Sequence, residues 1–178
     1  MSRNINKEQL AEVIEQKLAA YFAATPLITS LQRGRWALTT VAIKEFISRL
    51  GRDLEFEVSA SGCSNAGQEW LYDMVWYEVA DGYMTRLALA GECELTSPQL
   101  PVDDDFTKLV QARADVRLWI SAPKNREIAD THLANCKRYA ATFPGAMPGD
   151  TYVLVSCDWT DKITIVERFV VGQEALAN

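Results

Sequence analysis

The chain has 178 residues, of which 48% are hydrophobic and 24% are charged, and its formal net charge at pH 7 is −6. This composition is typical of one soluble globular domain with a sizeable core. The acidic balance argues against a protein that coats nucleic acid through nonspecific charge, but it leaves open a local basic groove or an acidic metal site.

The sequence predicts a reduced, cytoplasmic protein. No apolar run of about 18 residues predicts a membrane span, and the charged N-terminus lacks the apolar region of a secretory signal. The four cysteines are scattered, without the spacing of a zinc site or of a disulfide framework: Cys63, Cys93, Cys136 and Cys157.

The first part of the chain predicts two helices. The first covers residues 6–24, with Asn6 as its N-cap, and Pro26 ends it because the residue before a proline avoids the α region. The second covers residues 36–50, and Gly51 is expected to close it. The pattern then predicts a strand over 54–60, a loop over 61–68 and a hairpin over 69–95.

The hairpin over 69–95 is the stretch around which the chain is organised. Two arms rich in aromatic and aliphatic residues flank Asp81-Gly82, a pair that supplies the positive φ angles of a tight turn. The apolar arms carry Asp73 and Glu92. Because buried carboxylates are costly unless they are paired or bound to a cation, this hairpin is the best candidate for a functional site.

The register of the hairpin decides whether these carboxylates meet. A symmetric register places Asp73 opposite Ala90, with Glu92 as the diagonal neighbour, and a loop two residues longer places Asp73 opposite Glu92. In either case the carboxylates lie within roughly 5–8 Å of each other, close enough to share a divalent ion. A shift by one residue separates them onto opposite faces. Glu94 shares the face of Glu92 in any register, and the small side chains of Ala88 and Ala90 leave room for a ligand.

The second half of the chain predicts alternating helices and strands. After a breaker segment over 96–101, three acidic residues starting at Asp103 open a helix that extends through Arg113. The elements expected after it are a strand over 117–121, a helix over 124–141, a loop over 142–150 and a hairpin of strands over 152–159 and 163–171. This order predicts one domain over residues 1–178, with a mixed sheet flanked by helices.

The order helix, three strands, helix, strand resembles the PD-(D/E)xK nuclease superfamily and its restriction-endonuclease-like fold. The residues that carry the resemblance are Asp73 in LYDMVW and Glu92-Cys93-Glu94 in LALAGECEL. It covers roughly residues 36–121, about half of the chain. It implies an α/β (α+β) fold with a mixed central sheet flanked by helices.

The resemblance also implies a magnesium- or manganese-dependent nuclease that acts on nucleic-acid phosphodiesters. By resemblance, Asp73 and Glu92 are the metal ligands, the backbone carbonyl of Cys93 is a third, and Glu45 of the preceding helix is the positional candidate for another acid. A hard divalent cation takes oxygen ligands and withdraws charge from the scissile phosphate, which is the chemistry that these carboxylates provide for.

The chain departs from the family pattern at Glu94, where the family usually has a catalytic lysine. Three acids so close raise one another's pKa values unless a cation is present. Either the site binds metal with an extra acid, or it no longer performs chemistry. Lys108, one turn into the helix that follows, is placed to replace the missing lysine, and Gln111 lies a turn further on.

Other interpretations stay open. A catalytically inactive relative would use the fold as a binding or dimerisation module, and an unrelated interaction domain would pair Asp73 and Glu92 with Arg86 or Arg117. Lys108 would then pair with Asp104 or Asp105 on its own helix. His132 is expected to be an exposed or half-buried helix residue. The aromatic content predicts a homodimer. The basic residues that either line a phosphate groove or form a solvated face are Arg113, Arg117, Lys124, Arg126, Lys137 and Arg138.

Overall fold

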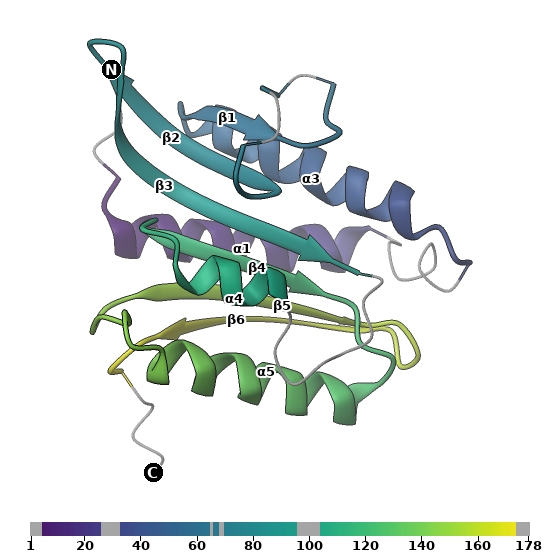
Figure 1. The fold of residues 1–178 in the computed structure, drawn as a ribbon. Coiled ribbons are helices and arrows are strands. Elements are labelled where there is room, and N and C mark those ends of the chain that lie inside the picture. Colours follow the sequence, from purple (N-terminus) through teal and green to yellow (C-terminus); the bar gives the residue numbers. More distant parts are fainter. Residues whose placement is uncertain (1–4, 26–32, 65, 68–69, 96–103, 174–178) are drawn as a thin grey trace.

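The computed structural model describes residues 5–25, 33–64, 66–67, 70–95 and 104–173. Within this part of the chain there are four helices and six strands (Figure 1). They are α1 (Lys7–Ala24), α3 (Trp36–Asp53), β1 (Glu57–Ala60), β2 (Met74–Ala80), β3 (Tyr83–Glu94), α4 (Asp104–Val110), β4 (Val116–Ser121), α5 (Arg126–Thr142), β5 (Thr151–Asp158) and β6 (Ile163–Val170).

The six strands form one mixed sheet in the order β1-β2-β3-β4-β5-β6. β3, β4 and β5 run parallel, whereas the pairs β1–β2, β2–β3 and β5–β6 are antiparallel. The predicted mixed α/β sheet flanked by helices is therefore confirmed. No helix in the described ranges is long and apolar enough to cross a membrane.

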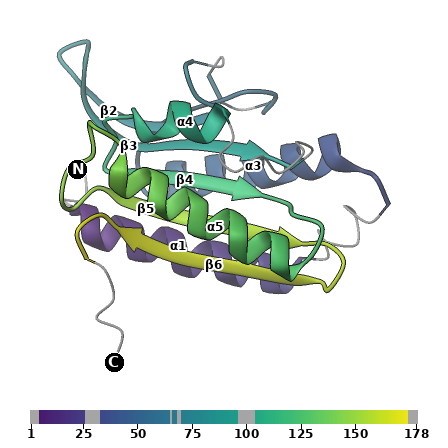
Figure 2. The same cartoon turned by 60° about the horizontal axis from the view of Figure 1, so that its bottom comes forward.

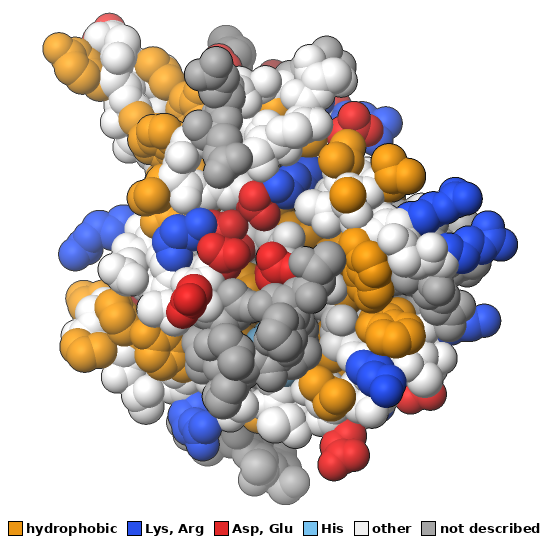
Figure 3. All heavy atoms as spheres, turned by 45° about the vertical axis from the view of Figure 1, so that its right-hand side comes forward, with side chains coloured by type: hydrophobic (Ala, Val, Ile, Leu, Met, Phe, Trp, Pro, Cys, Tyr) orange, Lys and Arg blue, Asp and Glu red, His pale blue; other side chains and the backbone are white. Residues whose placement is uncertain are grey.

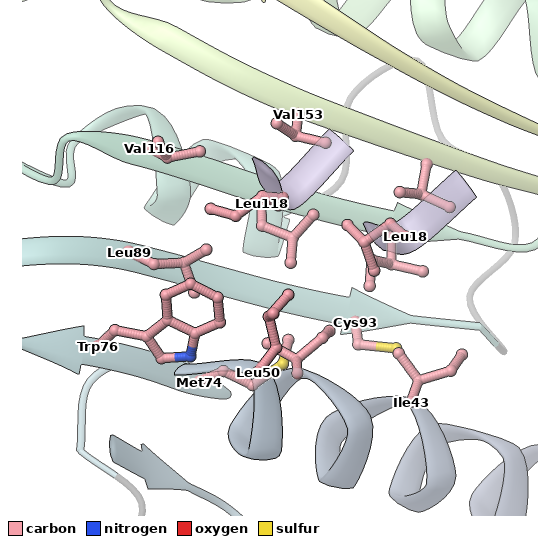
Figure 4. Close-up of a cluster of buried hydrophobic side chains, with 14 of the residues drawn as sticks. Leu18, Ile43, Leu50, Met74, Trp76, Leu89, Cys93, Val116, Leu118 and Val153 are labelled. Atoms are coloured by element: carbon pink, nitrogen blue, oxygen red, sulfur yellow. The ribbon is translucent and has the colours of Figure 1, made fainter. Parts of the chain in front are cut away.

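Helices cover both faces of the sheet, so the molecule has three layers (Figure 2). α1 and α3 pack on one face, where Leu18 and Ile43 meet Leu118 and Met74 in the larger hydrophobic core (Figure 4). α4 and α5 pack on the other face, in a second core that includes Phe106. Because side chains alternate along a strand, β2 to β6 contribute to both cores, whereas β1 contributes to the first core only.

The predicted first helix is confirmed as α1. The Asn6 side chain accepts a hydrogen bond from the backbone N–H of Gln9 at 2.9 Å, and the Gln9 side chain accepts one from the backbone N–H of Asn6 at 3.2 Å. This reciprocal capping box satisfies two donors that the first turn leaves unpaired. Thr25 is extended, as its position before a proline predicts.

The predicted end of the second helix was wrong, because Gly51 lies inside α3. A Cβ atom at this position would be 2.6 Å from Trp76 Nε1, so the glycine lets the helix approach the indole of β2. The following strand begins at Glu57, later than the predicted residue 54. Leu54 caps α3, and Glu55 takes a φ of 67°, which is incompatible with a regular strand.

The predicted hairpin and its turn are confirmed. Asp81 and Gly82 have φ angles of 54° and 81°, and Ala80 pairs with Tyr83 on either side of them. Both central residues have positive φ, as a two-residue turn with the twist of a hairpin requires. The first arm is shorter than predicted, because β2 starts only at Met74.

The second half of the chain follows the predicted order with two corrections. α4 ends at Val110, not at residue 113, because the backbone N–H groups of Gln111 and Ala112 bond carbonyls only three residues back and tighten the last turn. α5 begins two residues later than predicted, behind the N-cap Asn125, whose side chain accepts from Ile128 N at 3.0 Å. The predicted breaker over 96–101 and Asp103 lie outside the described residues.

The prediction for His132 was also wrong, because the histidine is buried, with 3% of its surface exposed. Its ring lies 6.1 Å from that of Trp119 in β4, and its Nε2 lies 3.7 Å from the Cys136 thiol. α5 therefore turns this histidine towards the sheet, beside Trp119.

Candidate functional site

The register of the β2–β3 hairpin brings the two predicted carboxylates together. Register shifts between Trp76 and Tyr77 and between Glu78 and Val79 each move the pairing by one residue. Together the two shifts change the symmetric register at the turn into a register that pairs Met74 with Gly91 at the far end of the hairpin. This register places Asp73 beside Glu92, as the hairpin with a longer loop would have done. Two irregularities in the strand pairing produce it instead of a longer loop.

Asp73 lies immediately before β2, and its carboxylate is held by three groups from different elements. Oδ2 accepts a hydrogen bond from the backbone N–H of Cys93 at 3.1 Å. Oδ1 lies 2.6 Å from Lys44 Nζ of α3 and accepts a bond from the Ser61 hydroxyl at 3.2 Å. The Asp73 carboxylate therefore lies at the end of the sheet, where it contacts Cys93 of β3 and Lys44 of α3, the helix that covers one face.

Glu92 is the buried carboxylate of the site, with 3% of its surface exposed. Its Oε2 accepts from the backbone N–H of Asp73 at 3.4 Å, and its Oε1 forms an ion pair with Lys108 Nζ of α4 at 2.7 Å. Burial raises the pKa of Glu92 to about 7; the contact with Lys108 opposes this rise and the charge of Asp73 adds to it. The Glu92 carboxyl group is therefore partly protonated near neutral pH.

The expectation that both carboxylates share one face of the sheet is not confirmed, because their partners lie on opposite faces. Asp73 is paired with Lys44 of α3, whereas Glu92 is paired with Lys108 of α4 on the opposite face of the sheet. The site therefore contains two carboxylates and two ammonium groups at the end of β3. Figure 3 shows acidic side chains gathered with basic ones beside them on the side of the molecule towards which β3 points in Figure 1.

Lys44 is the functional residue that the sequence reasoning missed. It is 7% exposed, and its Nζ donates to both Ser61 Oγ and Asp73 Oδ1 at 2.6 Å. Lysine is almost never fully buried unless it is paired. Its spacing was the available signal, because position 44 lies three residues before the apolar Ile47, which at helical spacing shares its face of the helix.

Lys108 contacts the site as predicted, and it also forms the alternative pair on its own helix. Its Nζ lies 2.7 Å from Glu92 and 3.2 Å from Asp105, and 6.0 Å from the centre of the Tyr72 ring. Burial lowers the pKa of Lys108, but its contacts with Glu92 and Asp105 outweigh this effect and raise the pKa above its usual value. Lys108 is therefore a fully charged ammonium at neutral pH.

Glu94, the residue at the family's lysine position, ends β3 opposite Ser121 of β4. It is half-buried and has the parity of Glu92 along the strand, so it lies on the α4 face. Its negative charge adds to the raised pKa of the Cys93 thiol, which burial raises most and the charges of Asp73 and Cys157 raise next. Glu94 therefore shares the face of Glu92, as predicted.

The remaining candidates lie elsewhere. Glu45 is exposed and lines a separate hollow with Cys63, and Gln111 is exposed with its side chain bonded to its own helix at Thr107 O, 3.0 Å away. The arginines proposed as structural partners pair with other acids. Arg86 contacts Glu78 and Asp115, and Arg117 contacts Asp150.

The donor set fits a divalent cation that retains water ligands. Among the described residues, no group of three or more His, Cys, Asp or Glu side chains is placed to hold a metal. Two carboxylates are nevertheless within the one or two that magnesium usually takes from a protein, with waters as its other ligands. Glu92 Oε1 is engaged by Lys108 Nζ at 2.7 Å, so a cation at this oxygen would take the place of the ammonium group.

Comparison of the chain with models of known protein families, with curated proteins and with solved structures gives no match. The functional argument therefore rests on the geometry of this site.

Proposed function

We propose that the protein is a divalent-metal-dependent phosphodiesterase with a restriction-endonuclease-like core, acting on nucleic acid. The observation that carries the proposal is the meeting of Asp73 and Glu92 at the end of the hairpin, where Glu92 Oε2 lies 3.4 Å from Asp73 N. The order α3, β1, β2, β3, α4, β4 supports it, because the PD-(D/E)xK resemblance implies a helix, three strands, a helix and a strand. The parallel pairing of β3 and β4 joins the last strand of this core to the strand that carries Glu92.

Each residue of the site has a distinct role in the proposed chemistry. Magnesium or manganese, when bound, supplies positive charge for the phosphate and for activating water. Asp73, Glu92 and the Cys93 carbonyl are the oxygen ligands. Lys108, whose side chain is 37% exposed, is free to turn from Glu92 towards a phosphate oxygen and replaces the lysine that Glu94 displaces. Lys44 positions Asp73, since it donates directly to the carboxylate and to Ser61.

Cleavage assays with single- and double-stranded DNA and RNA test this function. Asp73→Ala and Glu92→Ala should each lower the magnesium-dependent rate roughly a hundredfold or more, since a metal ligand stabilises charge that develops in the transition state. Lys108→Ala should lower it too, and Glu94→Lys should raise it. The matched controls are Glu57→Ala and Lys17→Ala, at exposed positions in β1 and α1. Equal rates in the variants and the controls would refute the proposal.

A catalytically inactive binding module is the second candidate. It is favoured by the ion pairs of the site, because Lys44 and Lys108 already neutralise Asp73 and Glu92 without any cation. In that case the native protein cleaves none of the four substrates with magnesium or manganese, and neither ion raises its melting temperature. This pair of results separates the two candidates, since a ligand that binds only the folded state must stabilise it.

A further inference from the structure

A polar hollow near the candidate site is lined by residues of α3 and of the loop that follows β1. Its volume is about 290 Å³, near the lower end of the range for ligand sites. The side chains that line it are Glu45, Ser48, Arg49, Arg52, Cys63 and Ser64. None of these residues belongs to the metal site proposed above.

The two segments that line the hollow, α3 and the loop after β1, also carry residues of that site. On α3, Lys44, Ser48 and Arg52 follow one another at four-residue spacing and form one stripe. Ser48 and Arg52 therefore lie about 6 and 12 Å along the helix axis from the lysine that holds Asp73. On the loop, Ser61 bonds Lys44 at 2.6 Å, and Ser64 lines the hollow three residues later. A nucleic-acid strand rises about 3.4 Å per nucleotide, so it spans this distance within a few nucleotides.

The electrostatics of the hollow favour an anion, although the whole chain carries a net charge of −6. Two exposed arginines, Arg49 and Arg52, face one acid, Glu45. No ion pair among the described residues engages Arg49, so its guanidinium remains open to an external anion. Burial raises the pKa of the Cys63 thiol, which the hydrogen bond with Ser48 opposes, so the thiol adds no negative charge at neutral pH.

The chemistry of the lining matches a phosphate group. Guanidinium groups bind phosphate oxygens through two parallel hydrogen bonds, which a lysine does not provide. The hydroxyl of the exposed Ser64 adds a neutral donor. Ser48, a residue only 1% exposed, hydrogen-bonds the Cys63 thiol and helps to line the hollow. An ordinary solvated helix face would carry the same arginines, but it would not place them over a hollow lined by hydroxyl-bearing residues.

We propose that this hollow binds a backbone phosphate of the nucleic acid whose phosphodiester reaches Asp73 and Glu92, so that the substrate strand runs along α3 past Lys44. This inference rests on the proposed function, because it assigns the substrate's path at the same site. It makes Arg49 and Arg52 binding residues that hold a flanking phosphate, several ångströms from the reacting atoms.

The test is the affinity for labelled single-stranded and duplex DNA and RNA oligonucleotides, measured by fluorescence anisotropy over a range of salt concentrations. Calcium replaces magnesium, so that the carboxylates keep a divalent cation during the titration. Arg49→Ala combined with Arg52→Ala should weaken binding about tenfold or more. It should also reduce the slope of log Kd against log salt by about one, since a single phosphate contact contributes about 0.7–0.9. Arg49→Lys combined with Arg52→Lys should keep the slope and lose part of the affinity.

Arg168→Ala is the matched control, because Arg168 is an exposed arginine of β6 that pairs with Glu15 of α1. The melting temperature of each variant checks its folding. Unchanged affinity and salt slope in the double alanine variant, or an absence of nucleic-acid binding by the native protein, would overturn the inference. If the native protein cleaves nucleic acid and the double alanine variant binds it with unchanged affinity, the phosphate site in the hollow is refuted and the proposed function stands. If the native protein never cleaves but the double alanine variant binds more weakly, the phosphate site stands and the nuclease is refuted.

Discussion

At the level of single residues, the electrostatics of the site depend most on Glu92. Its carboxylate is nearly inaccessible to water, next to Asp73, and its pKa is raised to about 7, chiefly by burial. The folded protein therefore holds the proton of Glu92 more tightly than the unfolded chain, in which the group titrates near 4.5. Stability from this group is fully present below pH 4.5 and is lost as the pH rises through about 7.

We expect Glu92→Gln to change this pH dependence. The difference in the free energy of unfolding, variant minus native protein, should increase by up to about 3 kcal/mol between pH 5 and pH 8. The native protein loses stability over this range as Glu92 ionises, whereas glutamine does not ionise. Urea unfolding at the two pH values measures the difference. Glu57→Gln, at an exposed position in β1, is the control and should show no such change. A constant difference between native protein and Glu92→Gln would contradict the raised pKa.

The pair Lys44–Asp73 offers a second prediction at this scale. Lys44→Met removes the cation that holds a partly buried carboxylate, so we expect it to destabilise the protein by about 1–3 kcal/mol. Asp73→Asn leaves the buried ammonium unpaired and should cost a similar amount. The double variant should be less destabilised than the sum, with a coupling of about 1–2 kcal/mol in a double-mutant cycle. Additive effects would mean that the ion pair contributes no stability.

The sequence could predict part of this site, for reasons that differ from residue to residue. Parity along the hairpin predicted that Asp73 and Glu92 meet, because only registers with an even offset were compatible with shared burial. Lys108 followed from the family resemblance. The pairing of Lys44 with Asp73 was not predictable from local pattern, since it depends on how α3 packs across the sheet and no spacing rule relates residues 44 and 73.

At the level of elements, the contact between α3 and β2 explains why a glycine lies within a helix. Elsewhere in a helix, replacing glycine by alanine stabilises by roughly 0.5–1 kcal/mol. In Gly51→Ala the new methyl group would meet the fully buried Trp76, which stacks on Phe56 at 5.9 Å.

We therefore expect Gly51→Ala to destabilise the protein by about 1–3 kcal/mol, the usual cost of overpacking a core. Thermal unfolding monitored by tryptophan fluorescence is a suitable measurement, because it also detects displacement of Trp76. Ala37→Gly, at an exposed position in the first turn of the same helix, should cost less than 1 kcal/mol and serves as the control. A stabilised Gly51→Ala would show that Gly51 has an ordinary helical role.

The existence and order of the elements were predictable, whereas several of their boundaries were not. Periodicity and turn residues were enough for each described helix and strand. The correction at α3 comes from a tertiary contact, since Gly51 packs on Trp76. The correction at α4 comes from the local turn after Val110, whose backbone N–H groups bond carbonyls three residues back. The two register shifts in the hairpin have no sequence signal of the kind that Asp81-Gly82 provides for the turn.

At the level of the whole molecule, the topology places the site where the antiparallel and parallel halves of the sheet meet. β3 pairs antiparallel with β2 and parallel with β4, so the end of β3 receives α3 from one face and α4 from the other. The mixed sheet with helices on both faces was predicted from the order of elements. The restriction-endonuclease-like core within it stays a proposal.

The homodimer also stays a prediction. The tip of the β2–β3 hairpin exposes 76% of Tyr83 and 40% of Met84, which gives a second copy an apolar contact. Sedimentation equilibrium at micromolar concentration should show a dimer, and Tyr83→Ser combined with Met84→Ser should shift it towards the monomer. A native protein that sediments as a monomer would rule the dimer out.

The most direct test of the account is the melting temperature of the protein as magnesium or manganese is added. If Asp73 and Glu92 hold a divalent cation, the native protein should gain about 3 kcal/mol at a hundredfold excess over the dissociation constant, which is about 5–10 °C for a chain of this length. Asp73→Asn and Glu92→Gln should each abolish the gain, while Glu57→Gln keeps it. A native melting temperature that does not respond to either ion, or that rises equally in all four proteins, would contradict a metal site formed by these two carboxylates.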